Sequence, residues 1–221
     1  MKRKKPMSSD NGTKSDRTRE RILHAAAKAF RGSGYALTSL REIADNADMQ
    51  AGSLYYHFAN KDELVEAVLD EGVLGAQRAA MAAVEALSDS ANPLQKIAAA
   101  FRGHLTYTLE EADFAVATLR MLHQTPDAVR TRHLRKQRAY GRFYANLFEE
   151  AKQQGLIRSE FNLSALRMLL LGALNWSPEW YDASGLSPDQ LVGQLTSMMQ
   201  SGVMPRNGLP KSADRRSGKR T

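Results

Sequence analysis

The sequence lacks cysteine, long apolar runs and a large aromatic fraction. None of its 221 residues is cysteine, and 7% are aromatic. Without cysteine there can be no disulfide bond, thiolate zinc site or thiol nucleophile. No stretch approaches the roughly 20 consecutive apolar residues that cross a bilayer, and the basic residues 1–6 lack the apolar segment of a secretory signal. We therefore expect a soluble, cytoplasmic protein that does not bind a membrane.

The motifs of common enzyme classes are also missing. The sequence has no glycine-rich phosphate loop, no HExxH zinc motif and no G-x-S-x-G nucleophile elbow. Each of these motifs holds reactive groups at a spacing that its chemistry requires. A small helical hydrolase or metal-dependent protein is therefore the weaker alternative. We expect a protein that is not an enzyme and that holds no metal and no cofactor.

The net charge of +7 is concentrated at the two ends of the chain. Residues 1–31 hold ten Lys or Arg and three acidic residues, and residues 203–221 hold six Lys or Arg and one acidic residue. A basic arm beside a small DNA-binding module suits phosphate contact, and solvated ends are the alternative. We expect a flexible basic arm over residues 1–15 and a flexible basic tail over residues 203–221.

Helical periodicity runs through nearly the whole chain, and strand-like alternation is almost missing. We therefore expect an all-α fold of about nine helices, with a helix-turn-helix domain over residues 16–60 and a helical ligand-binding and dimerisation domain over residues 61–202. The first helix is expected to stop at Gly32–Gly34, and the fourth to start after a cap at Asn60. The predicted helices cover about residues 16–31, 39–47, 51–58, 61–87, 93–111, 113–124, 126–155, 163–174 and 188–200.

Residues 38–58 give the strongest local signal. Two short helices joined by a short turn form a rigid unit whose second helix can enter the major groove of DNA. Thr38 or Ser39 is the candidate cap, and Ser39 and Glu42 have the spacing of a capping box. The apolar residues that would lock the two helices together are Leu40, Ile43, Ala44, Ala47, Leu54 and Phe58. The segment predicts a protein that binds double-stranded DNA.

A spaced set of residues between Ile22 and Leu64 carries a family pattern. Its members are Ile22, Leu23, Ala25, Ala26, Phe30, Gly34, Tyr35, Thr38, Ile43, Ala44, Ala47, Gly52, Leu54, Tyr55, Tyr56, His57, Phe58, Lys61 and Leu64. As a combination, this set resembles the DNA-binding domain of the TetR family of repressors. Each piece is weak alone, and the resemblance covers the N-terminal module better than the body.

The resemblance implies roles for particular residues. Thr38 would cap the second helix and donate to a phosphate, Arg41 would reach a base or phosphate, and Lys61 would contact a phosphate. Helix N-termini attract phosphate in any protein, which supports Thr38 and Lys61 independently. The predicted DNA-binding residues are Thr38, Arg41, Gln50, Ala51, Gly52, Ser53, Tyr55, Tyr56, His57 and Lys61.

Two residues depart from the family pattern. Asp48 replaces the usual turn glycine, and Asp tolerates left-handed backbone better than most residues. Gln50 replaces the usual Ser or Thr cap, so it is a poorer cap and could point toward DNA instead. Packing against neighbouring helices is the alternative for Tyr55 and Tyr56, and a plain surface position is the alternative for His57.

A protein with one short reading helix needs a second half-site, so we expect a twofold homodimer. Leucine-rich stripes on the last two helices would form a four-helix bundle with a second copy. The alternative is that both stripes face their own core. The predicted interface residues are Leu166, Leu169, Leu170, Ala173, Leu191, Leu195, Met198 and Met199.

The middle helices supply candidates for a small-molecule effector site, because an apolar cavity with a few polar groups is typical of such sites. Core packing is the alternative for each residue taken singly, and a fully packed body would favour a DNA-binding protein without a ligand. The candidates are Phe101, His104, Tyr107, Phe114, Met121, His123, Tyr140, Phe143, Tyr144, Met168, Trp176 and Trp180.

Two further features bear on the effector. The helix from Pro126 carries Arg130, Arg132, Arg135, Lys136, Arg138 and Arg142, either as a solvated, ion-paired face or as a site for an anionic headgroup. The stretch Leu174-Asn175-Trp176-Ser177-Pro178-Glu179-Trp180-Tyr181, with Gly185-Leu186-Ser187 after it, is similar to TetR-family regulators of fatty-acid and sterol breakdown. That resemblance implies an acyl-CoA effector.

The expected mechanism is release of DNA when the effector binds. The effector would wedge the middle helices apart and swing the helix of residues 61–87, which belongs to both domains. Gly72 and Gly75 lie midway along this helix and could soften it.

Overall fold

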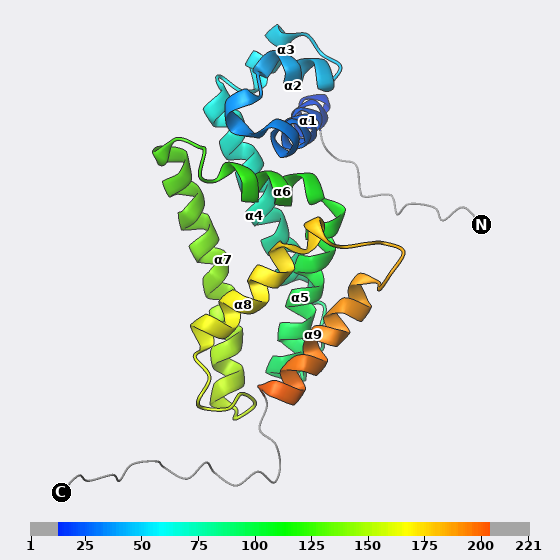
Figure 1. Cartoon of the computed structure of the whole chain (residues 1–221), viewed down its shortest axis with the longest axis vertical. Coiled ribbons are helices and arrows are strands. Elements are labelled where there is room, and N and C mark those ends of the chain that lie inside the picture. Colours follow the sequence, from blue (N-terminus) through cyan, green and yellow to red (C-terminus); the bar gives the residue numbers. More distant parts are fainter. Residues whose placement is uncertain (1–12, 204–221) are drawn as a thin grey trace, which may run out of the picture.

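The computed structural model describes residues 13–203, and within this range it contains nine α-helices and one 3-10 helix (Figure 1). The helices are α1 (Lys14–Leu37), α2 (Leu40–Asn46), α3 (Ala51–His57), α4 (Lys61–Glu85), α5 (Pro93–Glu110), α6 (Ala112–Met121), α7 (Asp127–Gln153), α8 (Leu163–Asn175), η1 (Ser177–Glu179) and α9 (Pro188–Gly202). The all-α prediction is confirmed. Nearly all of the predicted basic arm and tail lies outside the described residues.

Helix α1 is fixed at its start by a capping box and bends near its end. The Thr13 hydroxyl accepts a hydrogen bond from the N–H of Asp16, and the Asp16 carboxylate accepts one from the N–H of Thr13. The helix therefore begins two residues earlier than predicted. Gly34 has φ 73° and ψ 177°, so the predicted break is present there, but the chain resumes helical geometry as far as Leu37. Only glycine adopts such a backbone without strain.

The helices form an elongated molecule with α1, α2 and α3 at one end (Figure 1). Helix α4 leads from this end into the body, where it packs against α5, α6 and α7. Helix α6 packs against α1, while α8 packs against α7 and α5, and α9 packs against α5. The end that carries α2 and α3 is thus joined to the body through both α4 and α6.

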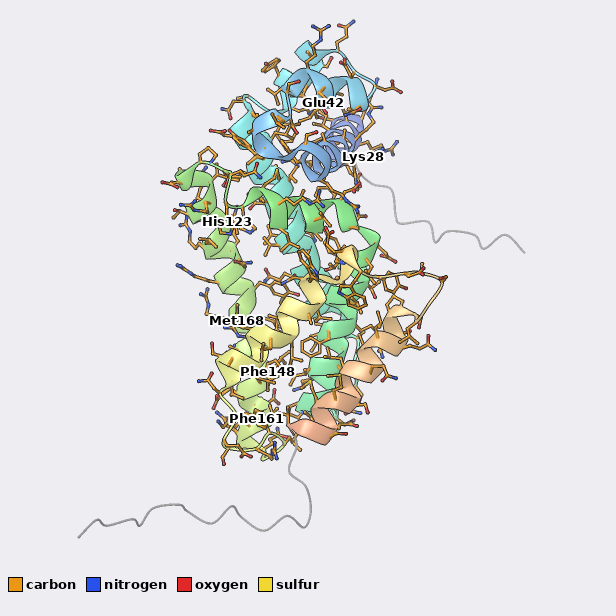
Figure 2. All side chains as sticks on the ribbon, in the orientation of Figure 1. Lys28, Glu42, His123, Phe148, Phe161 and Met168 are labelled. Atoms are coloured by element: carbon orange, nitrogen blue, oxygen red, sulfur yellow. The ribbon has the colours of Figure 1, made fainter. Side chains whose placement is uncertain are left out.

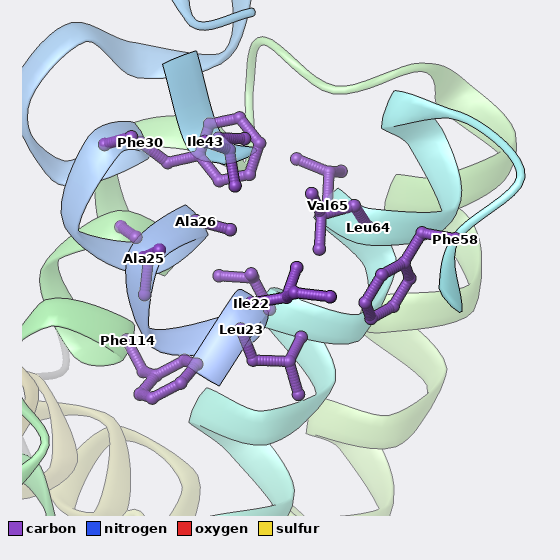
Figure 3. Packing of buried hydrophobic residues seen from close by; sticks show 14 of the residues in the cluster. Ile22, Leu23, Ala25, Ala26, Phe30, Ile43, Phe58, Leu64, Val65 and Phe114 are labelled. Atoms are coloured by element: carbon purple, nitrogen blue, oxygen red, sulfur yellow. The ribbon is translucent and has the colours of Figure 1, made fainter. Parts of the chain in front are cut away.

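Two clusters of buried apolar side chains hold the fold together. The first contains residues of α1–α4 together with Phe114 and Met121 of α6 and Val129 of α7 (Figure 3). The second joins α4, α5, α7, α8 and α9 around Phe101 and Phe148. The first cluster therefore continues across residue 60, where we expect the two domains to meet.

Helices α4 and α5 approach closely because glycines remove side chains from their interface. A Cβ atom added at Gly103 would lie 2.2 Å from the backbone oxygen of Ala79. A Cβ at Gly75 would lie 2.1 Å from the Tyr107 ring. Gly72 would meet Thr118 Oγ1 of α6 at 2.8 Å. Gly72 and Gly75 are thus explained by close packing, which replaces our expectation that they soften α4.

Among the described residues, no helix combines the length and the apolar character that crossing a bilayer requires.

Candidate nucleic-acid interface and effector region

The connection between α2 and α3 is set by local backbone geometry. Ser39 caps α2, since its hydroxyl accepts from the N–H of Glu42 while the Glu42 carboxylate accepts from the N–H of Ser39. Asp48 has φ 55°, which is the left-handed conformation expected at a turn position where the family pattern has glycine. Gln50 is the N-cap of α3 and makes no side-chain capping bond, as its poor capping ability predicts. Its amide is therefore available for another partner.

Helices α2 and α3 bury one face and expose the other. Ile43, Ala44 and Leu54 are fully buried against α1 and α4, which fixes the angle between the two helices. On the opposite face Tyr55 is 55% and Tyr56 is 85% exposed, so packing against other helices does not explain these tyrosines. An exposed pair of aromatic rings on a polar surface suits contact with a ligand surface.

Eight of the ten predicted DNA-binding residues lie together on α2, the turn and α3. Arg41, Gln50, Gly52, Ser53, Tyr55 and Tyr56 are exposed, and Ala51 and His57 are partly buried. We call this set the reading face: Arg41, Gln50, Ala51, Gly52, Ser53, Tyr55, Tyr56 and His57. It holds no carboxylate and offers hydrogen-bond donors, aromatic rings and a helix N-terminus, the groups with which proteins contact phosphates and bases.

Thr38 does not belong to this surface. It is 2% exposed, and its hydroxyl donates to the carbonyl oxygen of Gly34 at 2.7 Å. Ser39, and not Thr38, caps α2. The prediction that the Thr38 side chain caps this helix and donates to a phosphate is therefore wrong, because the hydroxyl is buried and used within the end of α1.

Lys61 lies at the first position of α4, beside an aromatic ring. Its ammonium nitrogen is 4.3 Å from the ring centroid of Tyr35, a cation–π contact. The Tyr35 hydroxyl donates to the carboxylate of Asp62, which with burial raises the pKa of Tyr35 to about 12. Burial lowers the pKa of Lys61. The helix N-terminus and the ammonium group together offer positive charge to a phosphate.

Sequence reasoning missed two residues near this surface. Tyr35, used above only as part of the family pattern, orients Lys61. The side chain of Leu37 is 81% exposed. No pattern in the sequence predicted an exposed apolar residue at this position. An aromatic residue directly after the kinked glycine was the available clue for Tyr35.

The central effector candidates form a packed, hydrogen-bonded cluster. Phe101 and Tyr144 are fully buried and stack with ring centroids 5.6 Å apart. His104 Nδ1 lies 2.8 Å from the Tyr140 hydroxyl, and the Tyr144 hydroxyl donates to the carbonyl of Ala100. Phe143 packs against Tyr144. For these residues the core-packing alternative describes what is observed.

The remaining effector candidates do not meet around one cavity. Phe114 and Met121 belong to the first core cluster, near α1. His123 is exposed at the corner between α6 and α7 (Figure 2). The other exposed candidates are Met168, Trp176 and Trp180. The prediction of one shared apolar pocket for all twelve residues is therefore wrong for this conformation.

Two neighbouring cavities of about 290 and 280 Å³ lie where α1 meets the body, and both are lined by Arg19, Leu23 and Glu71. Tyr107 and Phe114 are the effector candidates that line the first of them. The carboxylates around the two cavities belong to Asp16, Glu20, Glu63, Glu66, Asp70, Glu71 and Glu111. Burial raises the pKa of Glu111. An anionic effector would be repelled from this lining.

Stability is expected to fall in acid because His104 is buried. Its Nε2 lies 3.1 Å from the Asn175 side-chain oxygen, and burial lowers its pKa to about 4. Between pH 6.5 and 4 the unfolded chain binds a proton at His104 that the folded chain does not. The free energy of unfolding should therefore decrease, by up to about 3 kcal/mol, as the pH falls through this window.

Urea unfolding at several pH values measures this effect. A His104→Gln variant keeps polar groups but does not titrate, so the pH dependence over this window should be flatter. Buried His133, whose pKa is also lowered by burial, remains in both proteins and contributes the same slope. Identical slopes in the two proteins would contradict the assignment.

The two predicted dimerisation stripes differ in exposure. On α8, Met168 is 61% and Leu169 is 75% exposed, and Ala173 is also exposed, whereas Leu166 and Leu170 pack partly on the core. On α9, Met198 is 70% exposed, Leu191 and Leu195 are partly buried, and Met199 is 5% exposed. Met199 therefore belongs to the core and not to an interface. The exposed apolar residues of α8, with Trp176 directly after its end, form the α8 stripe: Ala165, Met168, Leu169, Ala173 and Trp176.

The basic residues of α7 divide into two groups. Arg132 donates two hydrogen bonds to Glu66 of α4, and these bonds lower the pKa of Glu66. Lys136 forms an ion pair with Asp70, which also lies in α4. Arg130 pairs with Asp127 one turn away. Arg135, Arg138 and Arg142 are exposed and have no ion-pair partner within residues 13–203. The ion-paired interpretation holds for the first group, and the second is free to meet an anion.

Comparison with known proteins supports the assignment of both parts of the chain. Residues 22–68 match the model of the bacterial regulatory proteins of the tetR family, and residues 90–203 match that of the tetracyclin repressor-like C-terminal domain. The HTH-type transcriptional repressor KstR2 of Mycolicibacterium smegmatis is 26% identical over 91% of this chain and 98% of its own length. The HTH-type transcriptional regulator TtgR of Pseudomonas putida is 49% identical over 24% of this chain and 25% of its own.

Solved structures share the fold. The ketosteroid transcriptional regulator KstR2 of Mycobacterium tuberculosis superposes with a TM-score of 0.73 at 21% identity, covering 85% of this chain and 95% of that one. AibR, solved in complex with isovaleryl coenzyme A and operator DNA, gives a TM-score of 0.69 at 26% identity, covering 82% and 97%. Since the C-terminal model alone spans more than half of the sequence, the chain belongs to the TetR family of bacterial regulatory proteins.

Proposed function

We propose that this protein is a cytoplasmic, homodimeric transcriptional repressor that binds operator DNA through the reading face and Lys61. The observation that carries the proposal is the exposure of Tyr55, Tyr56 and their polar neighbours on a helix pair that is rigidly packed on its other side. A second helix held in this way can enter the major groove. The relatives named as repressors support the same conclusion.

The dimer is proposed to form through the α8 stripe. Leu169 and Met168 would be unusual as solvated residues, and they recur with Trp176 at helical spacing on one side of α8. Exposed apolar patches of this kind mark association surfaces. A second copy, related by a twofold axis, presents the same patch and places two reading faces on one duplex.

The effector is proposed to be a small molecule, with an acyl-CoA as the first candidate. AibR, which shares this fold, was solved with isovaleryl coenzyme A and operator DNA. In this chain the exposed arginines Arg135, Arg138 and Arg142 offer donors to phosphate groups. Release of DNA on binding would make the protein a ligand-responsive repressor and not an enzyme.

A second candidate function is operator binding without a small-molecule ligand. The packed cluster of Phe101, His104 and Tyr144 favours it, because no open site separates these side chains. Addition of isovaleryl-CoA, with free CoA as a control, to the protein–DNA complex distinguishes the two candidates. Loss of binding with the thioester supports the effector, and unchanged binding across a panel of acyl-CoAs supports the second candidate.

DNA binding itself is tested with duplexes that tile the region upstream of the protein's own gene. Arg41→Ala and Tyr56→Ala should each weaken binding about tenfold or more, since each removes a contact worth about 1 to 3 kcal/mol. Thermal unfolding of both variants should be unchanged, because both side chains are exposed.

The matched control is Arg130→Ala. It also removes an arginine, but from an ion pair with Asp127 on α7, far along the chain from the reading face. It should bind DNA like the unchanged protein. Equal losses in Arg41→Ala and Arg130→Ala would show a general charge effect and contradict a specific role for Arg41, and unchanged binding by Tyr56→Ala would contradict a role for the exposed tyrosine.

A further inference from the structure

The kink in α1 exposes two backbone groups that receive partners from another part of the chain. Gly34 leaves helical geometry between Arg31 and Tyr35. An uninterrupted α-helix would join the carbonyl of Arg31 to the N–H of Tyr35, four residues later. Here the Arg120 guanidinium donates to the Arg31 carbonyl at 2.7 Å, and the Tyr35 N–H donates to Gln124 Oε1 at 3.2 Å.

Arg120, near the end of α6, and Gln124, in the turn after it, act as one unit, which we call the kink clamp. The Gln124 amide donates to the backbone carbonyl of Arg120 at 3.0 Å. A second guanidinium nitrogen of Arg120 lies 3.5 Å from the carboxylate of Glu179 in η1. The kink clamp therefore contacts α1 on one side and, through Glu179, the segment that follows α8 on the other.

The fit between clamp and kink is close. A Cβ atom at Gly34 would lie 2.9 Å from Gln124 Oε1, and the positive φ of Gly34 strains any other residue. The position of Gln124 thus depends on the conformation of the kink, and the conformation of the kink is supported by Gln124.

The kink in turn sets the position of Tyr35, which holds the start of α4. The Tyr35 hydroxyl donates to Asp62, and the Tyr35 ring lies beneath the Lys61 ammonium group at 4.3 Å. A displacement of the Tyr35 backbone would move both contacts. Lys61 would then leave the place where its charge adds to that of the helix N-terminus.

We propose that Arg120 and Gln124 are positioning residues for operator binding, which hold the α1 kink so that Tyr35 keeps Lys61 at the phosphate-binding start of α4. The inference rests on the proposed function, in which Lys61 contacts a DNA phosphate. The kink clamp acts through Tyr35 and Lys61, and its contact with Glu179 links the body to this phosphate contact.

The salt dependence of DNA binding by the full chain tests the proposal, on the tiled duplexes described above. Each phosphate contact contributes about 0.9 to the slope of log K against log salt concentration. Lys61→Met should lower the slope by about 0.9 per half-site. Gln124→Met removes the acceptor for the Tyr35 N–H, and it should weaken binding about fivefold to tenfold and lower the slope in the same sense.

Combining the substitutions shows whether Gln124 acts through Lys61. In the Lys61→Met background, Gln124→Met should weaken binding by less than about twofold, because the contact it supports is already lost. Gln124→Glu keeps the oxygen acceptor for the Tyr35 N–H but loses the amide donor to the Arg120 carbonyl, so it should bind DNA more tightly than Gln124→Met and less tightly than the unchanged protein. Gln153→Met is the matched control, since Gln153 is an exposed α7 residue bonded to Glu149.

The outcomes separate the two levels of inference. A lower melting temperature of Gln124→Met with an unchanged salt slope would show a structural role only and overturn the proposal, as would multiplicative effects of Gln124→Met and Lys61→Met. Failure of the unchanged protein to bind any duplex would refute the proposed function. An unchanged slope in Lys61→Met would refute the phosphate contact of Lys61 and the positioning role with it, and it would leave DNA binding by the reading face standing.

Discussion

Leu169→Glu is expected to convert the protein into a monomer that folds normally but binds operator DNA more than about a hundredfold less tightly. Leu169 is 75% exposed in the isolated chain, so a carboxylate there costs the monomer little. In the proposed dimer, Leu169 of each copy is buried in the interface. The substitution would therefore place two carboxylates opposite each other across the twofold axis. Loss of the second half-site removes the gain of bivalent binding, which reaches about 100-fold to 10,000-fold.

Analytical ultracentrifugation, circular dichroism and DNA binding measure the three parts of this expectation. Met81→Glu is the matched control, because Met81 is a partly exposed apolar residue of α4 outside the α8 stripe. It should remain dimeric and bind DNA. A dimeric Leu169→Glu protein would place the interface elsewhere on the molecule, and a monomeric unchanged protein would refute the dimer.

Gly103→Ala is expected to destabilise the fold by about 2 to 3 kcal/mol, the upper range for an overpacked core position. The new methyl group would lie 2.2 Å from the Ala79 oxygen and 2.9 Å from the Ala80 Cα, both backbone atoms that no side-chain rotation can move. Helices α4 and α5 must therefore separate. For a protein of this size the melting temperature should fall by about 4 to 12 °C.

Gly32→Ala provides the control for the glycine substitution. Gly32 lies in α1, is exposed and has no atom within 4 Å of the added Cβ. Alanine there should leave stability unchanged or raise it by up to about 1 kcal/mol, because glycine is the poorer helix former. Equal melting temperatures for the two variants would contradict close packing at Gly103. Thermal unfolding followed by circular dichroism gives both values.

The secondary structure was predictable because the signals are local. Capping boxes at Ser39 and Ser187 and the N-cap at Asn60 fix helix starts within a few residues, whatever the tertiary structure. The exposure of the reading face was predictable for a related reason, since burial of Leu54 and Phe58 leaves the other side of a seven-residue helix exposed.

The effector region was not predictable because the signal for a pocket and the signal for a core are the same. The residue types and spacing of Phe101 and Tyr144 fit a pocket lining and a core position equally well. The packing of five helices decides which of the two is formed. The prediction that Thr38 caps α2 failed for a different reason. Its neighbour Ser39 has equal capping ability, and the kink at Gly34 decides which hydroxyl turns inward. The α1 kink itself was visible in the sequence, but its partners Arg120 and Gln124 are remote in the chain.

The first core cluster limits how such a protein can acquire a new DNA target. Phe114 and Met121 of α6 fill the space beneath α1 together with Leu64 and Val65 of α4. A recombination event that exchanged the first 60 residues with those of a distant relative would bring unmatched apolar surfaces together. Under the proposed function, new target sequences are therefore reached more readily by point substitutions on the reading face than by exchange of the whole N-terminal segment.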